Sequence, residues 1–274
     1  MGVFTKKNNI ILKSPEEIEL LRKSSLIVSG ALTEVAKMLK PGVTGFDIDK
    51  RAEEYIRDQG AVPGFLGHGG FPGTLCISPN DHVVHGIPTE KPFEDGDVVS
   101  VDCGSILNGF YGDSAFTFAI GNVEERAMKL LKVTLDSLYI GIDQARKGNR
   151  IGDIGYAIQE YTERQHGYSV IRELVGHGIG RNLHEAPEVP NYGKRGRGPK
   201  IEVGLVIAIE PMVNLGKKDI VQSSDGWSII TKDHQLSAHY EHTVAVTESG
   251  PEHLSDHSTV VEAVKNNVNL SNIS

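Results

Sequence analysis

The segment from Val98 to Asp113 constrains the fold more than any other part of this chain, because it predicts two strands joined by a tight turn. Two runs rich in apolar residues flank Asn108-Gly109. Asn-Gly between such runs is the strongest short-range hairpin signal, since both central positions of a type I′ turn need positive φ. If these two residues form the loop, Asp102 faces Ala115, and Asp113 shares a face with Asp102 as its diagonal neighbour.

Two carboxylates on one face of buried strands need a positive partner. Asp102 is surrounded by valines, where an unpaired carboxylate loses several kcal/mol of hydration, and a second carboxylate nearby repels it. The alternative, a solvent-facing aspartate on an edge strand, fits Asp113 better than Asp102. No lysine or arginine occurs between residues 92 and 125. Diagonal pairs lie roughly 7–8 Å apart, a span that one or two cations can bridge, so we predict a metal site.

The composition is that of an ordinary globular protein. The 274 residues, 39% apolar and 23% charged, suffice for one large domain or two small ones. A net charge of -8 argues against binding to DNA. Only Cys76 and Cys103 are present, which indicates a reducing compartment. Because neither a signal peptide nor a membrane-length apolar run is found, we expect a cytoplasmic protein without a membrane partner.

Helices and strands alternate along the chain. Ser14 to Glu17 form a capping box, which predicts a helix that ends near Lys40. Periodicity and turn residues predict further helices over 46–59, 124–146 and 151–165, a Gly-rich loop over 63–73, and strands over 75–78, 203–210 and 239–247. We expect residues 1–13 to form an N-terminal tail and residues 256–274 a frayed C-terminal tail.

The chain contains a weak internal repeat. A shift of 106 residues places six residues of the segment 42–59 on identical residues of the segment 148–165. The matched pairs are Gly42 with Gly148, Asp47 with Asp153, Ile48 with Ile154, Glu54 with Glu160, Tyr55 with Tyr161, and Gln59 with Gln165. Similar composition of two amphipathic helices is the alternative explanation, but the repeat favours two related halves.

Further acids and histidines extend the predicted site. Glu210 follows five apolar residues, and a glutamate is almost never fully buried without a partner. Glu241, His177, His184 and His85 are weak signals when taken singly. Together, Asp102, Asp113, His177, Glu210 and Glu241 form a set of four carboxylates and one imidazole. Four negative charges match two divalent cations, which lower the pKa of water towards about 7 and so equip a site for hydrolysis.

These residues occur in motifs that resemble those of the type I methionine aminopeptidases. The motifs are HGIP at His85, two aspartates eleven residues apart, GHGIG at His177, EPM at Glu210 and YEHT at Glu241. The likeness covers roughly residues 14–247. It implies an α/β (α+β) pita-bread fold, with two pseudo-symmetric halves, about 14–120 and 121–255, around a central antiparallel sheet. It also implies one catalytic domain over 14–255.

The resemblance further implies a site and an activity. Two divalent cations, of Co, Mn, Fe or Zn, would be ligated by the five residues above. They would hold a hydroxide that attacks the first peptide bond of a nascent protein, with Glu210 as general base. His184 would steady the carbonyl oxygen, and His85 would lie near the leaving nitrogen. An apolar pocket for the methionine side chain would be lined by Phe65, Phe71, Cys76, Leu183 and Trp227, for each of which ordinary core packing is the alternative.

The chain departs from the family pattern at two places. His68-Gly69-Gly70-Phe71 stands where relatives usually have Tyr-His-Gly-aromatic, and Gly104 stands where threonine is common. Both positions bear on pocket shape, metal preference and turnover. A basic loop with Lys194, Arg195, Arg197 and Lys200 offers a contact with the ribosome, although a solvated loop is the simpler explanation in an acidic protein.

The resemblance thus implies an aminopeptidase that removes initiator methionine when the second residue is small, and it suggests a monomer. One alternative is an X-Pro aminopeptidase or creatinase-like hydrolase. Such relatives carry an additional N-terminal domain, for which we expect no room in this chain. The other is a catalytically silent peptide-binding module of the same fold, which is disfavoured because all five predicted ligands are present.

Overall fold

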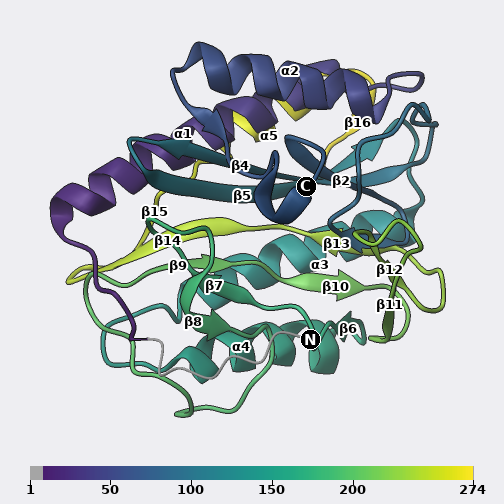
Figure 1. The fold of residues 1–274 in the computed structure, drawn as a ribbon. Coiled ribbons are helices and arrows are strands. Elements are labelled where there is room, and N and C mark those ends of the chain that lie inside the picture. Colours follow the sequence, from purple (N-terminus) through teal and green to yellow (C-terminus); the bar gives the residue numbers. More distant parts are fainter. Residues whose placement is uncertain (1–8, 274) are drawn as a thin grey trace.

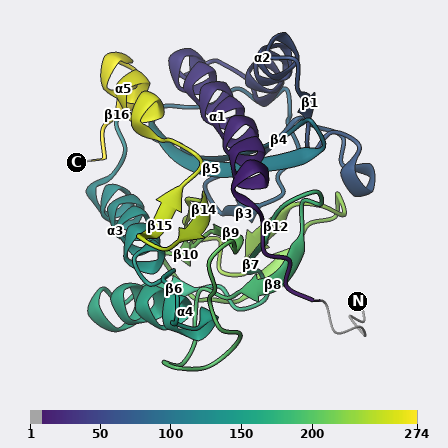
Figure 2. The same cartoon turned by 90° about the vertical axis from the view of Figure 1, so that its left-hand side faces the viewer.

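The computed structural model describes residues 9–273, which form two layers of helices around a curled antiparallel sheet (Figures 1 and 2). Helices α1 (Pro15–Met38), α2 (Gly45–Asp58) and α5 (Ser258–Asn266) cover one face. Helices α3 (Glu125–Ile142) and α4 (Ile151–Gln159) cover the other. The predicted α/β pita-bread architecture is confirmed. Within residues 9–273, no helix is both long and apolar enough to cross a membrane.

The central hairpin forms in the predicted register. Strands β4 (Val98–Leu107) and β5 (Phe110–Ile120) flank Asn108 and Gly109, whose φ values of 52° and 77° are those a type I′ turn requires. Asp102 pairs with Ala115 and Gly104 pairs with Asp113, so the two aspartates are diagonal neighbours on one face. Strands β1 (Val62–Pro63) and β2 (Leu75–Pro79) pair with the outer edge of β4.

The second half of the chain contributes another five strands in the order β15-β14-β9-β7-β8. They are β15 (Gly250–His253), β14 (His242–Thr247), β9 (Val206–Ile209), β7 (Gly176–Gly178) and β8 (Glu185–Val189). Backbone and side-chain bonds join the two halves: the Glu241 amide donates to Ala115 O at 3.0 Å, and the Thr243 hydroxyl donates to Asp113 O at 2.8 Å. These bonds bring Asp113 and Glu241 together.

Two further sheets, each of three strands, complete the fold. One contains β13 (Ser237–His239), β10 (Met212–Asn214) and β6 (Ser169–Val170). The other contains β11 (Ile220–Gln222), β12 (Ile229–Thr231) and β3 (His82–Val84). Because β3 belongs to the first half and β11 and β12 to the second, this sheet places the His85 segment beside Trp227.

The internal repeat corresponds to equivalent local structures. Gly42 and Gly148 both adopt positive φ, 91° and 95°, immediately before α2 and α4. At the start of these helices Asp47 and Asp153 each accept a hydrogen bond from the backbone amide three residues earlier, at 2.9 and 2.7 Å. The repeated glycine and aspartate therefore encode the same stop and start in both halves.

Three expectations need correction. Residues 256–274 do not form a frayed tail, because α5 packs on α1 and β16 (Leu270–Ser271) pairs with the edge of β5. The helix expected over 151–165 is α-helical only to Gln159 and continues as a π-helical turn, η2 (Glu160–Gln165). The loop over 63–73 contains a short 3-10 turn, η1 (His68–Gly70). Most of the expected N-terminal tail lies outside the described residues, but Lys13 is buried against Glu185.

Candidate metal centre

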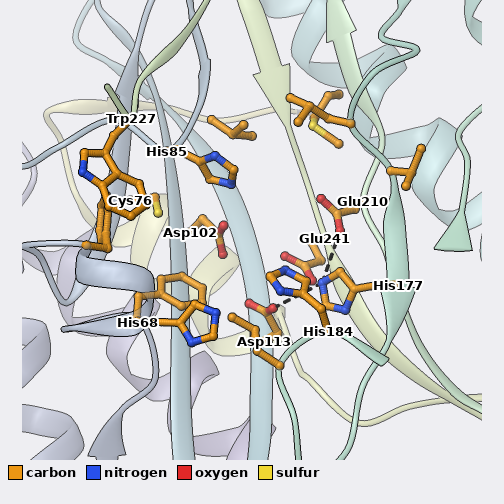
Figure 3. A pocket seen from close by; sticks show the side chains of 17 residues that line it. His68, Cys76, His85, Asp102, Asp113, His177, His184, Glu210, Trp227 and Glu241 are labelled. Carbon is orange, nitrogen blue, oxygen red and sulfur yellow. Dashed lines mark ion pairs between the residues drawn. The ribbon is translucent and has the colours of Figure 1, made fainter. Parts of the chain in front are cut away.

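A cavity of about 250 Å³ lies between the two halves of the sheet (Figure 3). Each half of the chain supplies one wall, and all twelve residues predicted for the site line it. They are Phe65, Phe71, Cys76, His85, Asp102, Asp113, His177, Leu183, His184, Glu210, Trp227 and Glu241. The cavity has a carboxylate-rich end and an apolar end.

Strand ends and strand interiors position the carboxylate-rich end. Asp102 and Asp113 project from β4 and β5, Glu210 follows β9, and Glu241 precedes β14. His177 of β7 completes the set, with Nε2 at 3.5 Å from Glu210 Oε1 and 3.7 Å from Asp113 Oδ2. Ligand atoms of Asp113, His177 and Glu241 all lie within 4.8 Å of one another. This spacing suits coordination by one ion.

The carboxylates are mutually repulsive and largely desolvated. Burial raises the pKa of Asp102 to about 7. Burial, together with the charges of Glu241 and Asp102, raises the pKa of Asp113 well above its usual value. The pKa values of Glu210 and Glu241 are also raised, first by burial and then by neighbouring carboxylates. No lysine or arginine is among the described residues that line the cavity.

Several oxygen atoms here lack partners. Asp102 Oδ1, Asp113 Oδ1 and Glu241 Oε1 are buried and accept no hydrogen bond within the described part of the chain. Buried polar atoms are normally satisfied, and hard oxygen donors with one imidazole are ligands that divalent cations accept. The donor set therefore fits a divalent metal.

His177 is held in the form that a metal requires. Its Nδ1–H donates to Gly178 O at 3.0 Å, which leaves the Nε2 lone pair directed at the carboxylates. Burial lowers the pKa of His177 to about 3, so the imidazole is neutral at physiological pH. A neutral imidazole oriented by a carbonyl acceptor is the usual state of a metal-ligating histidine.

Two further histidines stand at the mouth of the cavity. His85 has φ +58°, a left-handed conformation that non-glycine residues rarely adopt and that occurs at functional sites. The next residue must be glycine, because a Cβ on Gly86 would lie 2.0 Å from Ile77 O. The His184 ring lies 4.4 Å from that of His177. Desolvation lowers the pKa of both His85 and His184, and electrostatic interaction with the neighbouring His68 and His85 lowers that of His184 further.

The apolar end is formed by aromatic and aliphatic side chains. Phe71 and Trp227 meet edge to face at 5.3 Å between ring centroids, and Phe65, Cys76 and Leu183 belong to the same buried cluster. The unusual Gly104 explains part of this packing, because a Cβ there would lie 2.5 Å from the Phe65 ring. Phe65 therefore occupies the space that a larger residue at position 104 would take.

Sequence reasoning missed two residues of this region. His68, noted only as an unusual residue, lines the mouth of the cavity, with its ring 6.0 Å from that of His184. His239 lies buried behind the carboxylates, with Nε2 at 3.7 Å from Glu210 Oε2. No local pattern marks His239, because Tyr240 and Glu241 lie between β13 and β14 and the alternation of a single strand does not connect His239 with Glu241.

Residues 19–248 match metallopeptidase family M24. The chain belongs to this family. M24 membership agrees with the donor set of the cavity and indicates an enzyme that binds a divalent metal.

Individual relatives point to a narrower group of proteins than the family does. A methionine aminopeptidase of Clostridium acetobutylicum is 51% identical over 244 residues, which are 89% of this chain and 97% of that protein. The crystal structure of a methionine aminopeptidase from Thermotoga maritima has a TM-score of 0.89 at 43% identity, covering 90% of this chain and 100% of that one. The resemblance to methionine aminopeptidases is thereby confirmed.

A solved structure of lower identity shows a likeness of fold alone. The prolidase from Pyrococcus furiosus is 23% identical with a TM-score of 0.74, and the match covers 90% of this chain and 65% of that one.

Proposed function

We propose that this chain removes the initiator methionine from nascent proteins whose second residue is small. The observation that carries this proposal is the cavity itself: an apolar end adjoins an end with four carboxylates and His177. The sequence identity of 51% to a methionine aminopeptidase over 89% of this chain supports the proposal.

The metal ligands in this proposal are Asp102, Asp113, His177, Glu210 and Glu241. They would hold two divalent cations of the Co, Mn, Fe or Zn type, since four carboxylates would leave excess charge around a single ion. When bound, such cations supply Lewis-acid polarisation of the substrate carbonyl and lower the pKa of water. Cation binding also neutralises the repulsion that raises the pKa of Asp113 and Glu241.

The protein groups then act on the first peptide bond. Glu210 takes a proton from the attacking water and passes it to the leaving nitrogen. Neutral His184 donates a hydrogen bond to the carbonyl oxygen as negative charge develops there. His85 faces the nitrogen that leaves. The apolar end holds the methionine side chain and excludes water from it.

The crowded mouth supports the preference for a small second residue. His68, His85 and His184 all line the opening through which the part of the peptide beyond the methionine must extend. The substrates are N-terminal peptides of nascent proteins, the enzyme acts in the cytoplasm as a monomer, and the basic loop around Arg195 offers a contact to the ribosome.

A peptide assay tests the proposal. Protein loaded with Co²⁺ or Mn²⁺ is incubated with Met-Gly-Met-Met and, separately, with an X-Pro peptide, and products are separated by chromatography. We expect release of methionine from the first peptide only. Cleavage of the proline peptide alone would contradict the substrate assignment, and no cleavage with any divalent ion would favour a silent binding module.

The role of Glu210 is tested by Glu210→Gln. Loss of the proton acceptor should lower kcat by roughly 10²–10⁴-fold. Glu202→Gln, an exposed glutamate eight residues earlier, is the matched control and should leave kcat unchanged. Turnover by Glu210→Gln at the rate of the control would remove Glu210 from the mechanism.

A further inference from the structure

His239 is a buried histidine that the proposed mechanism does not use. His239 is 1% exposed. Its backbone is held by Thr117 of β5, whose hydroxyl donates to His239 O at 2.6 Å and accepts from His239 N at 3.0 Å. The Thr117 hydroxyl is in turn bonded to Ser100 at 2.8 Å. Hydrogen bonds to β4 and β5, the two strands that carry Asp102 and Asp113, therefore hold the His239 backbone in place.

Strand geometry directs this side chain toward the metal centre. His239 is the last residue of β13, and Tyr240 and Glu241 lie between β13 and β14. The Tyr240 hydroxyl donates to Thr117 O at 3.0 Å. In the neighbouring strand Met212 pairs with His239, and Glu210 lies two residues before Met212. Residues paired across strands share a face and Met212 lines the cavity, so His239 lies on the cavity side of β13, near Glu210, which Figure 3 labels in the cavity.

One atom of His239 has no partner. Nε2 is buried and makes no hydrogen bond to any residue from 9 to 273. Glu210 Oε2 lies 3.7 Å from it, and the other oxygen of that carboxylate lies 3.5 Å from His177 Nε2. The distance exceeds a hydrogen bond by less than 1 Å, and hydrogen bonds of catalytic groups are often long before substrate binds. A buried imidazole nitrogen facing one carboxylate oxygen has a clear complementary partner.

We propose that His239 is a positioning residue for Glu210: its Nε2–H donates to Glu210 Oε2 and fixes the orientation of that carboxylate toward metal and substrate. This inference rests on the function proposed above. Glu210 extends from the end of a strand, where its side chain has several rotamers, and a donor behind it selects one of them. His239 itself touches neither substrate nor the reacting bond.

Two substitutions separate hydrogen-bond donation from space filling. His239→Gln keeps an N–H donor of similar reach, and His239→Leu keeps an apolar side chain of similar size without a donor. His234→Leu, at an exposed histidine outside the cavity, is the matched control. Each full-length variant is stripped of metal and titrated with Mn²⁺ by calorimetry. Steady-state kinetics with Met-Gly-Met-Met and thermal unfolding complete the set.

We expect His239→Leu to bind Mn²⁺ roughly 10–100-fold more weakly, because an unsupported ligand is less well oriented. Its kcat should fall by a similar factor while KM changes by less than about threefold, since Glu210 acts in the transition state and does not bind the methionine side chain. His239→Gln should remain within about threefold of the unsubstituted chain in both measurements.

Other results would overturn the proposal. Equal Mn²⁺ affinity and equal kcat for His239→Leu and the His234→Leu control, with a change only in unfolding temperature, would show that His239 merely fills space. A loss in His239→Gln as large as in His239→Leu would show that donation is not its role. If the unsubstituted chain fails to cleave the peptide, the proposed function fails, and Mn²⁺ affinity alone then decides the role of His239.

Discussion

Single residues in this cavity show how an atypical sequence changes a shared site. Gly104 pairs with Asp113 across the hairpin, and Phe65 packs over it at a distance that leaves no room for a Cβ. The Phe65 ring is also part of the apolar end of the cavity. The glycine and the phenylalanine therefore act as a pair, in which a change at one position requires a change at the other.

Gly104→Thr tests this pairing. The new side chain should push the Phe65 ring into the cavity, since overpacking of a filled core forces neighbours from their rotamers. We expect kcat/KM for Met-Gly-Met-Met to fall roughly tenfold, a typical effect of one ill-fitting group in an apolar pocket. Adding Phe65→Ala should recover part of the loss. A double variant no better than Gly104→Thr alone would show that Phe65 does not transmit the effect.

The residues that carry the site differ in how far the sequence could predict them. Asp102 and Asp113 were predictable because a local turn, Asn108-Gly109, fixes their register. Glu210 was predictable because an acid after five apolar residues is anomalous. His239 gave no such signal, since its burial and its carboxylate neighbour arise from the pairing of β13 with β10, which no local pattern encodes.

At the scale of elements, helix α5 is the clearest failure of local reasoning. Its sequence is largely polar, with Val260, Ala263 and Val264 as a narrow buried stripe. A helix of this kind is marginal by itself and forms through tertiary contacts. The contact is with α1, more than two hundred residues earlier: Asn267 Nδ2 donates to Ala36 O and Leu39 O, both at 2.8 Å. These bonds satisfy carbonyls at the end of α1.

Asn267→Ala should therefore lower the free energy of unfolding by about 1–3 kcal/mol, because it leaves partly buried carbonyls without a donor. Asn266→Ala, at the exposed neighbouring position, is the control and should change stability by less than about 0.5 kcal/mol. Urea unfolding followed by circular dichroism measures both. Equal stability of the two variants would mean that α5 docks through its apolar stripe alone.

At the scale of the whole molecule, the metal centre joins the two halves of the fold. Asp102 and Asp113 come from the first half, and His177, Glu210 and Glu241 from the second. Without a cation, repulsion between their carboxylates acts directly across this junction. We therefore expect the site to lower the stability of the metal-free protein and a bound cation to reverse this effect.

Removal of the metal should make stability depend on pH in a defined direction. Burial raises the pKa of Asp102 to about 7, and the pKa values of Asp113, Glu210 and Glu241 are also raised. Above the unfolded-state pKa of about 4, the folded metal-free protein therefore binds more protons than the unfolded chain, so its stability falls as pH rises through the folded-state pKa values.

Thermal unfolding at about pH 5.5 and about pH 8.5, in EDTA and in excess Mn²⁺, measures this linkage. Mn²⁺ binds the ionised carboxylates, so the increase in Tm on adding it should be larger at the higher pH. Asp102→Asn, which cannot ionise, should reduce the fall in metal-free stability between the two pH values, whereas Asp95→Asn at the protein surface should not. An equal Mn²⁺ effect at both pH values would contradict the coupling between carboxylate ionisation and the stability of the joined halves.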